Sequence, residues 1–507
     1  MRRAATALAA VVAVLLVSGC APETRSDWAP ASWHTVGTVT TDLPATSDAD
    51  APTVAMRLRN DTVGLDARWA ILPGDHPANA VIERVVRDAV AGRVEATGAA
   101  YHPEVFPAGA GLGTRGCAPG ETTRTASDIL AGRAGAVVVC EITAARGPLF
   151  AETLRTVVGE GGTVTSDRTD VVYADLATGA VGTGDDLLTD TAALWTTTVD
   201  TVRRYMGSLS LAAVAAPDDA QLAAFRAALS GARFAEGALY IPVAADLRAS
   251  ELDGLVRWQA RGEERPLHVR FTAEEIASSL TDLGREVLEA SGPFTGAASA
   301  GAGFEHMPCD LVPCMAMTLD DGPSTLTPTF LDVLRDEQSA ATFFMLGKNA
   351  ERHPDTVARV AAEGHEIGNH TWDHAYLTDL TDARVQAELG DTRALLQRLS
   401  GQSIPFFRPP GGFVNEHVIA LAGQSAILWS VDTRDWAGPA AADLARYAID
   451  TPRPGTIMLM HDIQAVTQSV FHDVVTGLRD RGFQLVTIDG LFGGAVPSGQ
   501  VRHGPIP

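Results

Sequence analysis

The order of hydrophobic and polar positions divides the chain into two regions with different patterns. From Thr53 to Ala290 helical and strand periods both occur, which predicts an α+β fold. Apolar residues recur with helical period over 81–90, behind Asn79 as a candidate N-cap. The β-branched run at 136–143 predicts a strand, and 191–206 has the pattern of a helix.

The second region, from Cys309 to Gly494, alternates short apolar runs with helical segments. This order predicts a mostly parallel α/β sheet or barrel, whose functional residues lie at the C-terminal ends of the strands. The runs are 316–319, 342–345, 427–431, 457–460 and 484–488.

The N-terminus has the features of an export signal. Arg2 and Arg3 precede an apolar run over 4–17, and the segment ends in Val-Ser-Gly-Cys at Cys20. This end resembles a bacterial lipobox, so we expect lipidation at Cys20 and a lipoprotein tethered to the outer face of the cytoplasmic membrane. The alternative is an ordinary secretory signal with an incidental cysteine.

Composition changes along the chain predict the domain boundaries. A Pro-, Ser- and Thr-rich segment reads as a tether, and a Gly- and Ala-rich one as a linker. The expected parts are a signal peptide (1–20), a tether (21–52), an accessory domain (53–290), a linker (291–308), an α/β domain (309–494) and a tail (495–507).

Length, composition and net charge limit the number of domains and the kinds of binding partner. A chain of 507 residues should hold two or three domains, and its 46% hydrophobic and 20% charged residues indicate globular folding. The formal net charge of -23 argues against nucleic acid or an anionic membrane surface as a main partner. It is compatible with a neutral polymer, or simply with a well-solvated surface.

Export would place the other four cysteines in an oxidising setting. Sequential pairing of Cys117 with Cys140 and Cys309 with Cys314 is the simplest of three connectivities. Zinc binding by these cysteines is the alternative, but no histidine lies at ligand spacing near either pair.

The strongest chemical signal is a metal-site pattern in the second region. Asp320 and Asp321 end an apolar run, and His370 and His374 follow about fifty residues later. Imidazoles at i and i+4 share one face of a helix, and a carboxylate can complete a two-His, one-Asp set. Such a set leaves coordination positions free for water and substrate, as catalytic metal sites do.

Five motifs in order resemble the polysaccharide deacetylase family, also called carbohydrate esterase family 4 or the NodB-homology domain. The resemblance covers about Cys309 to Gly494 and implies a distorted (β/α) barrel catalytic domain preceded by a separate α+β domain. The motifs are Thr318-Leu319-Asp320-Asp321-Gly322, His370-Thr371-Trp372-Asp373-His374, Arg408-Pro409-Pro410-Gly411-Gly412, Asp432-Thr433-Arg434-Asp435-Trp436 and Leu459-Met460-His461.

The resemblance implies the role of each residue that carries the reaction. Asp321, His370 and His374 would bind one divalent metal ion, zinc first, with cobalt, manganese or nickel as alternatives. Asp320 matches the family's catalytic base, and His461 matches the general acid that protonates the leaving nitrogen.

Supporting roles follow from the same motifs. Arg408 would hold the catalytic base ionised, and Asp435 would orient the general acid. The backbone N–H of Gly411 would donate to the oxyanion. Trp436 and Leu459 would line the pocket for the acetyl methyl group.

Two positions depart from the family pattern. Leu319 replaces a phenylalanine at a core position, where an apolar exchange should cost little. Gly411 replaces an aromatic residue, so the backbone donor is kept but any sugar contact from that side chain is absent. Substrate preference is therefore open, although the reaction is not.

The first region has a weaker resemblance to the extracytoplasmic domain of lysozyme-sensing anti-sigma factors. It rests on the turn at 175–179, the segment 183–188 and the segment 234–242. That domain is also found fused to cell-wall deacetylases, which implies a substrate-positioning or wall-binding module.

Taken with export, these features predict a metal-dependent hydrolase that removes N-acetyl groups from peptidoglycan amino sugars, N-acetylglucosamine or N-acetylmuramic acid, and releases acetate. The alternatives are a deacetylase or esterase acting on chitin or acetyl-xylan, and a non-catalytic sensor of wall fragments.

Overall fold

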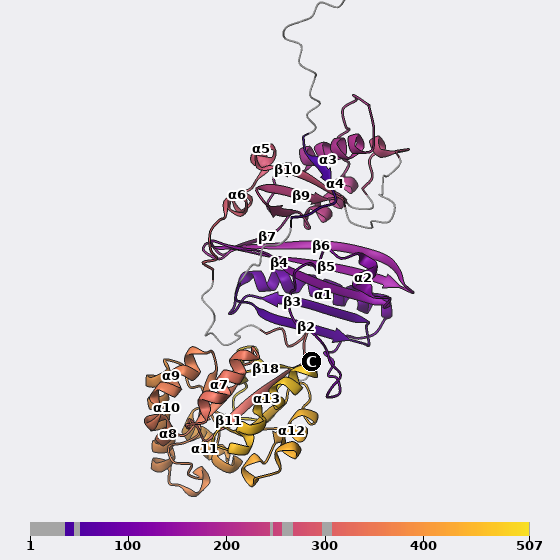
Figure 1. Cartoon of the computed structure of the whole chain (residues 1–507). Helices are drawn as coiled ribbons and strands as arrows, with labels where there is room; N and C mark the ends of the chain where they lie inside the picture. The colour runs from indigo at the N-terminus through magenta and orange to yellow at the C-terminus, as the bar shows by residue number, and fades with distance from the viewer. Residues whose placement is uncertain (1–35, 45–50, 244–246, 256–266, 297–306, 506–507) are drawn as a thin grey trace, which may run out of the picture.

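The computed structural model describes residues 36–44, 51–243, 247–255, 267–296 and 307–505. The predicted signal peptide with Cys20, most of the tether and much of the linker lie outside these residues. Figure 1 shows three successive layers: a small sheet, a larger sheet with a long helix, and an α/β domain. The N-terminal region that the sequence predicts as one α+β domain therefore contains two sheets.

The larger N-terminal sheet has the strand order β2-β3-β4-β5-β6-β7, antiparallel except between β3 and β4. Alternation of buried and partly buried side chains along β2 and β3 leaves one face to pack on α1. The elements are β2 (Val54–Asn60), β3 (Leu65–Ile71), α1 (Pro77–Thr97), α2 (Ala126–Leu130), β4 (Gly135–Arg146), β5 (Leu149–Glu160), β6 (Thr163–Asp175) and β7 (Ala180–Thr183).

Helix α1 contains the apolar positions expected for it, with Ile82 and Val86 in the core. Its N-cap is His76 rather than Asn79, and the His76 side chain accepts a hydrogen bond from the Ala78 amide. Asn79 is buried inside the first turn and bonds both backbone groups of Leu72. A cap prediction from residue type alone missed this contact, in which the asparagine side chain bonds a residue that precedes the helix.

The smaller sheet has the order β1-β10-β9-β8 and packs with the larger sheet in one core. Tyr173 of β6 connects the two sheets, because its hydroxyl donates to the Ala232 carbonyl and accepts from the Phe234 amide. The remaining elements are β1 (Thr38–Thr40), α3 (Thr191–Tyr205), α4 (Asp219–Leu229), β8 (Arg233–Ala235), β9 (Ala238–Pro242), β10 (His268–Thr272), α5 (Ala273–Ile276) and α6 (Asp282–Glu289).

Two boundaries differ from the sequence prediction. Strand β1 lies inside the predicted tether, and Val39 pairs with Val269 of β10. Strand β19 (Gln500–Val501) lies inside the predicted loose tail, where it pairs with β15 and buries Val501. Both strands are too short to produce a recognisable period, and their order comes from a partner distant in sequence.

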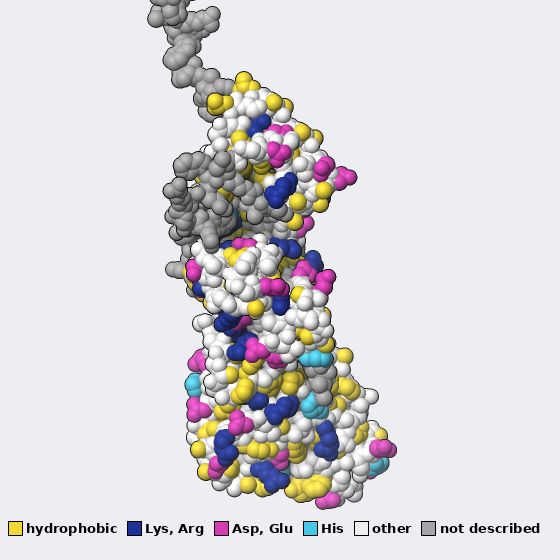
Figure 2. All heavy atoms as spheres, turned by 90° about the vertical axis from the view of Figure 1, so that its right-hand side faces the viewer, with side chains coloured by type: hydrophobic (Ala, Val, Ile, Leu, Met, Phe, Trp, Pro, Cys, Tyr) yellow, Lys and Arg dark blue, Asp and Glu magenta, His cyan; other side chains and the backbone are white. Residues whose placement is uncertain are grey.

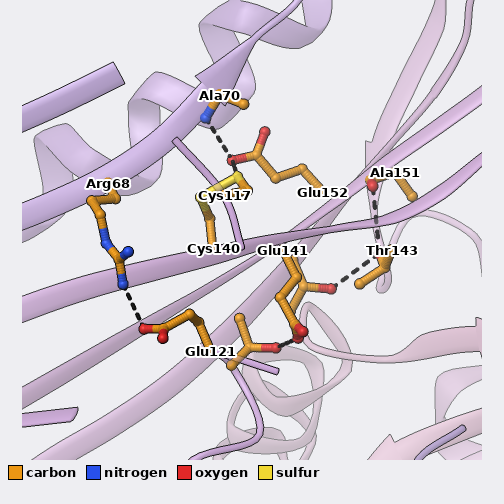
Figure 3. Close-up of a disulfide and its surroundings, with 11 residues drawn as sticks. Arg68, Ala70, Cys117, Glu121, Cys140, Glu141, Thr143, Ala151 and Glu152 are labelled. Carbon is orange, nitrogen blue, oxygen red and sulfur yellow. Dashed lines mark hydrogen bonds and ion pairs between the residues drawn. A yellow bond between two sulfur atoms is a disulfide. The ribbon is translucent and has the colours of Figure 1, made fainter. Parts of the chain in front are cut away.

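Both predicted cysteine pairs are disulfides, Cys117–Cys140 and Cys309–Cys314. Figure 3 shows the first one, which joins the loop before α2 to β4 beside the Glu152 carboxylate. Glu152 accepts a hydrogen bond from the Ala70 amide, and burial raises the pKa of this carboxyl well above its usual value. Because the sulfurs bond each other, they are not available as zinc ligands.

The C-terminal domain is built on a curled parallel sheet of order β16-β17-β11-β12-β13-β14-β15-β19, with β18 also pairing with β11. It has the distorted-barrel architecture that the family resemblance implies, and it confirms the mostly parallel sheet that the alternating pattern predicts. Its strands are β11 (Cys314–Asp320), β12 (Thr342–Met345), β13 (Glu366–Asn369), β14 (Phe406–Phe407), β15 (Ser425–Ile427), β16 (Val431–Asp432), β17 (Ile457–His461), β18 (Gln484–Val486) and β19.

Helices connect these strands, and their apolar faces pack on the sheet in a core of Leu, Val, Phe and Met side chains. The helices are α7 (Thr327–Asp336), α8 (Gly347–Arg352), α9 (Pro354–Ala362), α10 (Asp382–Ser400), α11 (Glu416–Ala422), α12 (Ala441–Asp450), α13 (Ala465–Asp480) and α14 (Ile488–Leu491). The predicted apolar run 427–431 is divided between β15 and β16, and the run 484–488 forms β18 and the start of α14.

The larger N-terminal sheet joins the C-terminal domain at the N-terminal ends of the barrel strands. Gln338, after α7, accepts from the Ala55 amide at 3.0 Å and donates to the Thr53 carbonyl at 2.8 Å. Arg481, after α13, donates to the Phe106 carbonyl at 2.9 Å. The opposite ends of the strands are therefore left clear of this joint.

Acidic and basic side chains are interspersed over the face that Figure 2 presents. The strongly negative net charge is thus not gathered into a single acidic patch on that face. Among the described residues, no helix has the length and apolar character needed to cross a bilayer.

Candidate active site

The predicted site residues lie together at the C-terminal ends of the parallel strands. Asp320 is the last residue of β11 and His461 the last of β17, and the two are paired in register. His370 follows β13, and Arg408 follows β14. This convergence is what a parallel α/β sheet provides at its carboxyl edge.

The segment that contains His370 and His374 is a loop and not the helix that the i, i+4 spacing suggested. Thr371 and His374 both have positive φ, at 69° and 70°. The loop is held from beneath by Glu388 of α10, whose Oε2 accepts from the amide of Trp372 at 2.8 Å and from the amide of Asp373 at 3.2 Å. The two imidazoles converge because of this loop geometry and not because of a helical face.

Asp321, His370 and His374 form a group that could hold a metal ion, and we call these three residues the candidate metal site. Asp321 Oδ1 lies 3.4 Å from His370 Nε2 and 3.5 Å from His374 Nε2. This oxygen is buried and has no hydrogen-bond partner within the described part of the chain. A carboxylate oxygen that faces two imidazole nitrogens instead of hydrogen-bond donors suits a cation between them.

The tautomer of His370 also suits a metal. Its Nδ1 lies 2.7 Å from the Arg408 carbonyl oxygen, and a carbonyl can only accept, so Nδ1 carries the proton. The Nε2 lone pair is then free to coordinate. Burial alone would raise the pKa of Asp321, but the neighbouring imidazoles, His370 foremost, lower it to about 2, so this ligand is anionic at neutral pH.

Asp320 lies beside the candidate metal site and is held by Arg408. Arg408 Nη1 donates to Asp320 Oδ1 at 2.7 Å and to Thr318 Oγ1 at 2.6 Å. The guanidinium also donates to two backbone carbonyls and lies 4.0 Å over the Phe344 ring. Burial lowers the pKa of Arg408, and the Asp320 carboxylate opposes this effect, so the two side chains hold each other in place as a buried ion pair.

His461 lies on the other side of the site and is oriented by Asp435. Asp435 Oδ1 accepts from His461 Nδ1 at 2.7 Å, and its Oδ2 accepts from the His461 amide at 2.8 Å and from Thr467 Oγ1. Burial alone would lower the pKa of His461, but the hydrogen bond and charge of Asp435, aided by Asp320, raise it to about 9. His461 is therefore protonated at neutral pH, with Nε2 directed to the site.

The remaining predicted residues surround this edge. Gly411 lies in the 3-10 turn Pro410–Gly412 with φ 63°, a conformation that favours glycine. Trp436 is 58% exposed in the 3-10 turn that begins at Asp435, whereas Leu459 of β17 is almost fully buried. Trp436 is therefore free to cover a ligand, while Leu459 can offer only a small apolar surface.

Several residues that build the site were not singled out from the sequence. Glu388 carries no local signal, because an acidic residue in an amphipathic helix usually faces solvent. Asn369 holds the same loop through an Oδ1 contact with the Thr371 amide, although it precedes His370 directly. His365, five residues before His370, is buried and accepts from the Ala341 amide.

Comparison with known proteins supports the assignment to a family. The sequence profile described as polysaccharide deacetylase matches residues 309–427. A Bacillus cereus peptidoglycan-N-acetylglucosamine deacetylase is 36% identical over 187 residues, which cover 35% of this chain and 87% of the relative. A Listeria monocytogenes protein of the same name is 38% identical over 180 residues, covering 35% of this chain but only 39% of the relative.

A solved structure described as T48 deacetylase with substrate is also similar. It is 36% identical, covers 38% of this chain and 99% of its own, and superimposes with a TM-score of 0.37. The profile match at 309–427 lies within the C-terminal domain, the part that contains every residue of the site. Through this domain, the chain belongs to the polysaccharide deacetylase family.

Proposed function

We propose that this protein is a metal-dependent hydrolase that removes N-acetyl groups from amino sugars of peptidoglycan and releases acetate. The observation that carries the proposal is the arrangement around Asp321, His370 and His374, with Asp320 on one side and His461 on the other. A pair of groups suited to be base and acid beside a metal site is what amide hydrolysis requires.

The candidate metal site would hold one divalent ion, for which two imidazoles and one carboxylate suit zinc first, and cobalt, manganese or nickel as alternatives. When bound, such an ion supplies Lewis acidity, which lowers the pKa of water and polarises the acetyl carbonyl. The protein holds the ligands ready for it, because the Arg408 carbonyl fixes the His370 tautomer and Asp321 is ionised.

The chain's own groups then manage the protons. Asp320, held in place by the hydrogen bond from Arg408, accepts the proton of the attacking water. His461, protonated and oriented by Asp435, donates a proton to the departing amine nitrogen. The backbone N–H of Gly411 would stabilise the negative charge that develops on the acetyl oxygen.

The acetyl group needs a small apolar recess beside these groups. Trp436 and Leu459 would provide it, since the first follows Asp435 in the chain and the second precedes His461 by two residues. A recess for a methyl group distinguishes an acetyl amide from longer acyl amides by roughly 1–3 kcal/mol per methylene.

Peptidoglycan is the proposed substrate because the similar proteins from Bacillus cereus and Listeria monocytogenes are named peptidoglycan deacetylases. A Bacillus subtilis relative, 33% identical over 178 residues, is named for N-acetylmuramic acid instead, so both amino sugars are candidates. An export signal ending at Cys20 would tether the enzyme to the outer face of the membrane, next to the wall. The N-terminal sheets would then act as a wall-binding or substrate-positioning module.

The test is acetate release from purified peptidoglycan by residues 21–507, with and without a chelator, beside Asp320→Asn. Chelator-sensitive release that the variant loses supports the proposal. Release from chitin oligomers or acetyl-xylan but not from peptidoglycan would overturn the substrate and keep the reaction. No release from any polymer by metal-loaded protein would favour a non-catalytic sensor.

A further inference from the structure

Two aromatic rings lie exposed beside the candidate metal site and have no role in the chemistry described above. Tyr376 is 47% exposed and Phe413 is 56% exposed. Their ring centroids are 5.3 Å apart at 71°, an edge-to-face contact. Tyr376 also lies 6.3 Å from the ring of His374, so the pair extends outward from a residue of the candidate metal site.

The backbone explains how the two rings reach this place. Phe413 follows the Pro410–Gly412 turn, in which Gly411 has φ 63°. A Cβ atom at Gly411 would lie only 2.9 Å from two Phe413 ring carbons and 3.2 Å from Tyr376 Cε1. The rings therefore pack directly against the glycine whose N–H is the proposed oxyanion donor.

This packing bears on the absence of an aromatic side chain at Gly411, where the family pattern has one. An aromatic side chain at position 411 would occupy space that Phe413 and Tyr376 already fill, and the left-handed backbone there disfavours any side chain. The aromatic surface is thus not lost at Gly411. It is supplied from two other positions, one after the turn and one after the histidine loop.

The exposure of Tyr376 and Phe413 indicates a binding surface because both rings lie beside the candidate metal site. A single exposed phenylalanine is common on protein surfaces and needs no explanation. Here two rings hold each other at a fixed angle, and both adjoin groups that act on substrate. The apolar C–H face of a pyranose ring can cover an aromatic face while the sugar hydroxyls stay in water, as amphipathic ligands do at aromatic surfaces.

We propose that Tyr376 and Phe413 form a sugar-binding subsite that takes the pyranose ring next to the acetylated residue of a β-linked amino-sugar chain. The inference rests on the proposed function and deepens it, because it makes the enzyme selective for chains over single sugars. The two residues bind and position the glycan, and they exchange no proton with it.

The test compares Phe413→Ala and Tyr376→Ala with wild type on two substrates, N-acetylglucosamine tetramer and 4-nitrophenyl acetate. For the tetramer we expect KM to rise about tenfold in each variant, as for other aromatic anchors. The loss of kcat/KM on the small ester should be clearly smaller, since the ester has no neighbouring sugar. Tyr205→Ala, which removes a ring 46% exposed on α3, is the matched control and should change neither substrate.

Conservative variants at Phe413 distinguish the effect of an aromatic ring from the effect of side-chain size alone. Phe413→Tyr should keep the wild-type KM for the tetramer, whereas Phe413→Leu, which is apolar but not aromatic, should not. An unchanged KM in both alanine variants, or a leucine variant equal to wild type, would overturn the subsite. Melting temperatures confirm that each variant is folded before its kinetics are compared.

A binding measurement keeps this inference separate from the proposed function. In the Asp320→Asn background, calorimetric titration with the tetramer should give a Kd about tenfold higher when Phe413→Ala is added. Wild type that releases no acetate from tetramer or peptidoglycan would refute the proposed function. Equal Kd values with and without Phe413→Ala would refute the subsite, whether or not acetate is released.

Discussion

Arg408 Nη1 and Asp320 Oδ1 form an ion pair 2.7 Å long in which the arginine side chain is fully buried and the aspartate side chain is 3% exposed. Arg408 has polar partners around the guanidinium, including Thr318 Oγ1 and two strand carbonyls. Burial lowers the pKa of Arg408, and the Asp320 carboxylate opposes that effect. The Asp320 carboxylate thus helps Arg408 to keep its charge inside the domain.

Loss of the arginine should damage both stability and activity. We expect Arg408→Ala to reduce the free energy of unfolding by roughly 3–5 kcal/mol, because it leaves Asp320 buried without its partner. Denaturant unfolding and acetate release measure the two effects. Arg446→Ala removes an exposed ion pair with Asp443 and should cost less than about 1 kcal/mol. Equal costs for the two variants would contradict the importance of the buried pair.

The pH dependence of the reaction should report the contact between Asp435 and His461. Because His461 must be protonated to act as an acid, kcat/KM should fall as pH rises through its pKa of about 9. Asp435→Asn removes the charge that raises this pKa, so the alkaline limb should move to lower pH by about one unit or more. Thr467→Val removes a neutral partner of Asp435 and should move the limb less. An unchanged limb in Asp435→Asn would exclude His461 as the titrating acid.

Metal removal should be reversible in wild type and not in a ligand variant. A chelator should abolish acetate release, and added zinc should restore it. His374→Ala removes one of two imidazoles and should weaken metal affinity by more than about 100-fold, measured by competition with a chromogenic chelator. His417→Ala, at an exposed histidine paired with Asp382, is the control and should bind metal normally. Stoichiometric, tight metal in His374→Ala would remove that residue from the site.

Glu388 should affect the metal without touching it. Its carboxylate holds the Trp372 and Asp373 amides between the two histidines, so Glu388→Ala should free the loop and weaken metal affinity about 10- to 100-fold. Arg384→Ala removes the exposed partner of Glu388 and leaves the amide contacts in place, so it should cost much less. Equal affinity in Glu388→Ala and wild type would show that the loop keeps its shape unaided.

His365 predicts a component of acid sensitivity. Burial, followed by the charge of Arg359, lowers its pKa from 6.5 to about 3. Between these two pH values His365 is protonated in the unfolded chain but neutral in the folded chain. The free energy of unfolding therefore falls as pH decreases from 6.5 toward 3, by at most about 1.4 kcal/mol per pH unit. His365→Gln cannot titrate and should show a shallower decline from pH 6.5 to 4 in urea unfolding. A parallel decline in both proteins would assign the sensitivity to other groups.

The C-terminal ends of the strands could be located from the sequence, because strands of a parallel sheet are buried on both faces and stand out as apolar runs. Asp320 and His461 could be placed at strand ends for that reason. The histidine loop could not be foreseen, since the positive φ of Thr371 and His374 depends on Glu388 and Asn369 in other elements. The same limit applies to β1, β19 and the Phe413 ring, whose positions come from partners distant in the chain.

The joint between the N-terminal sheets and the barrel uses Gln338 and Arg481, which follow helices, whereas the reaction uses residues that follow strands. Two separate sets of connecting segments therefore carry attachment and chemistry. Evolution can alter one set while the other stays constant, so homologous enzymes can inherit the same attachment with a different sugar preference. A recombinant exchange at the joint should likewise transfer a complete reaction centre between chains.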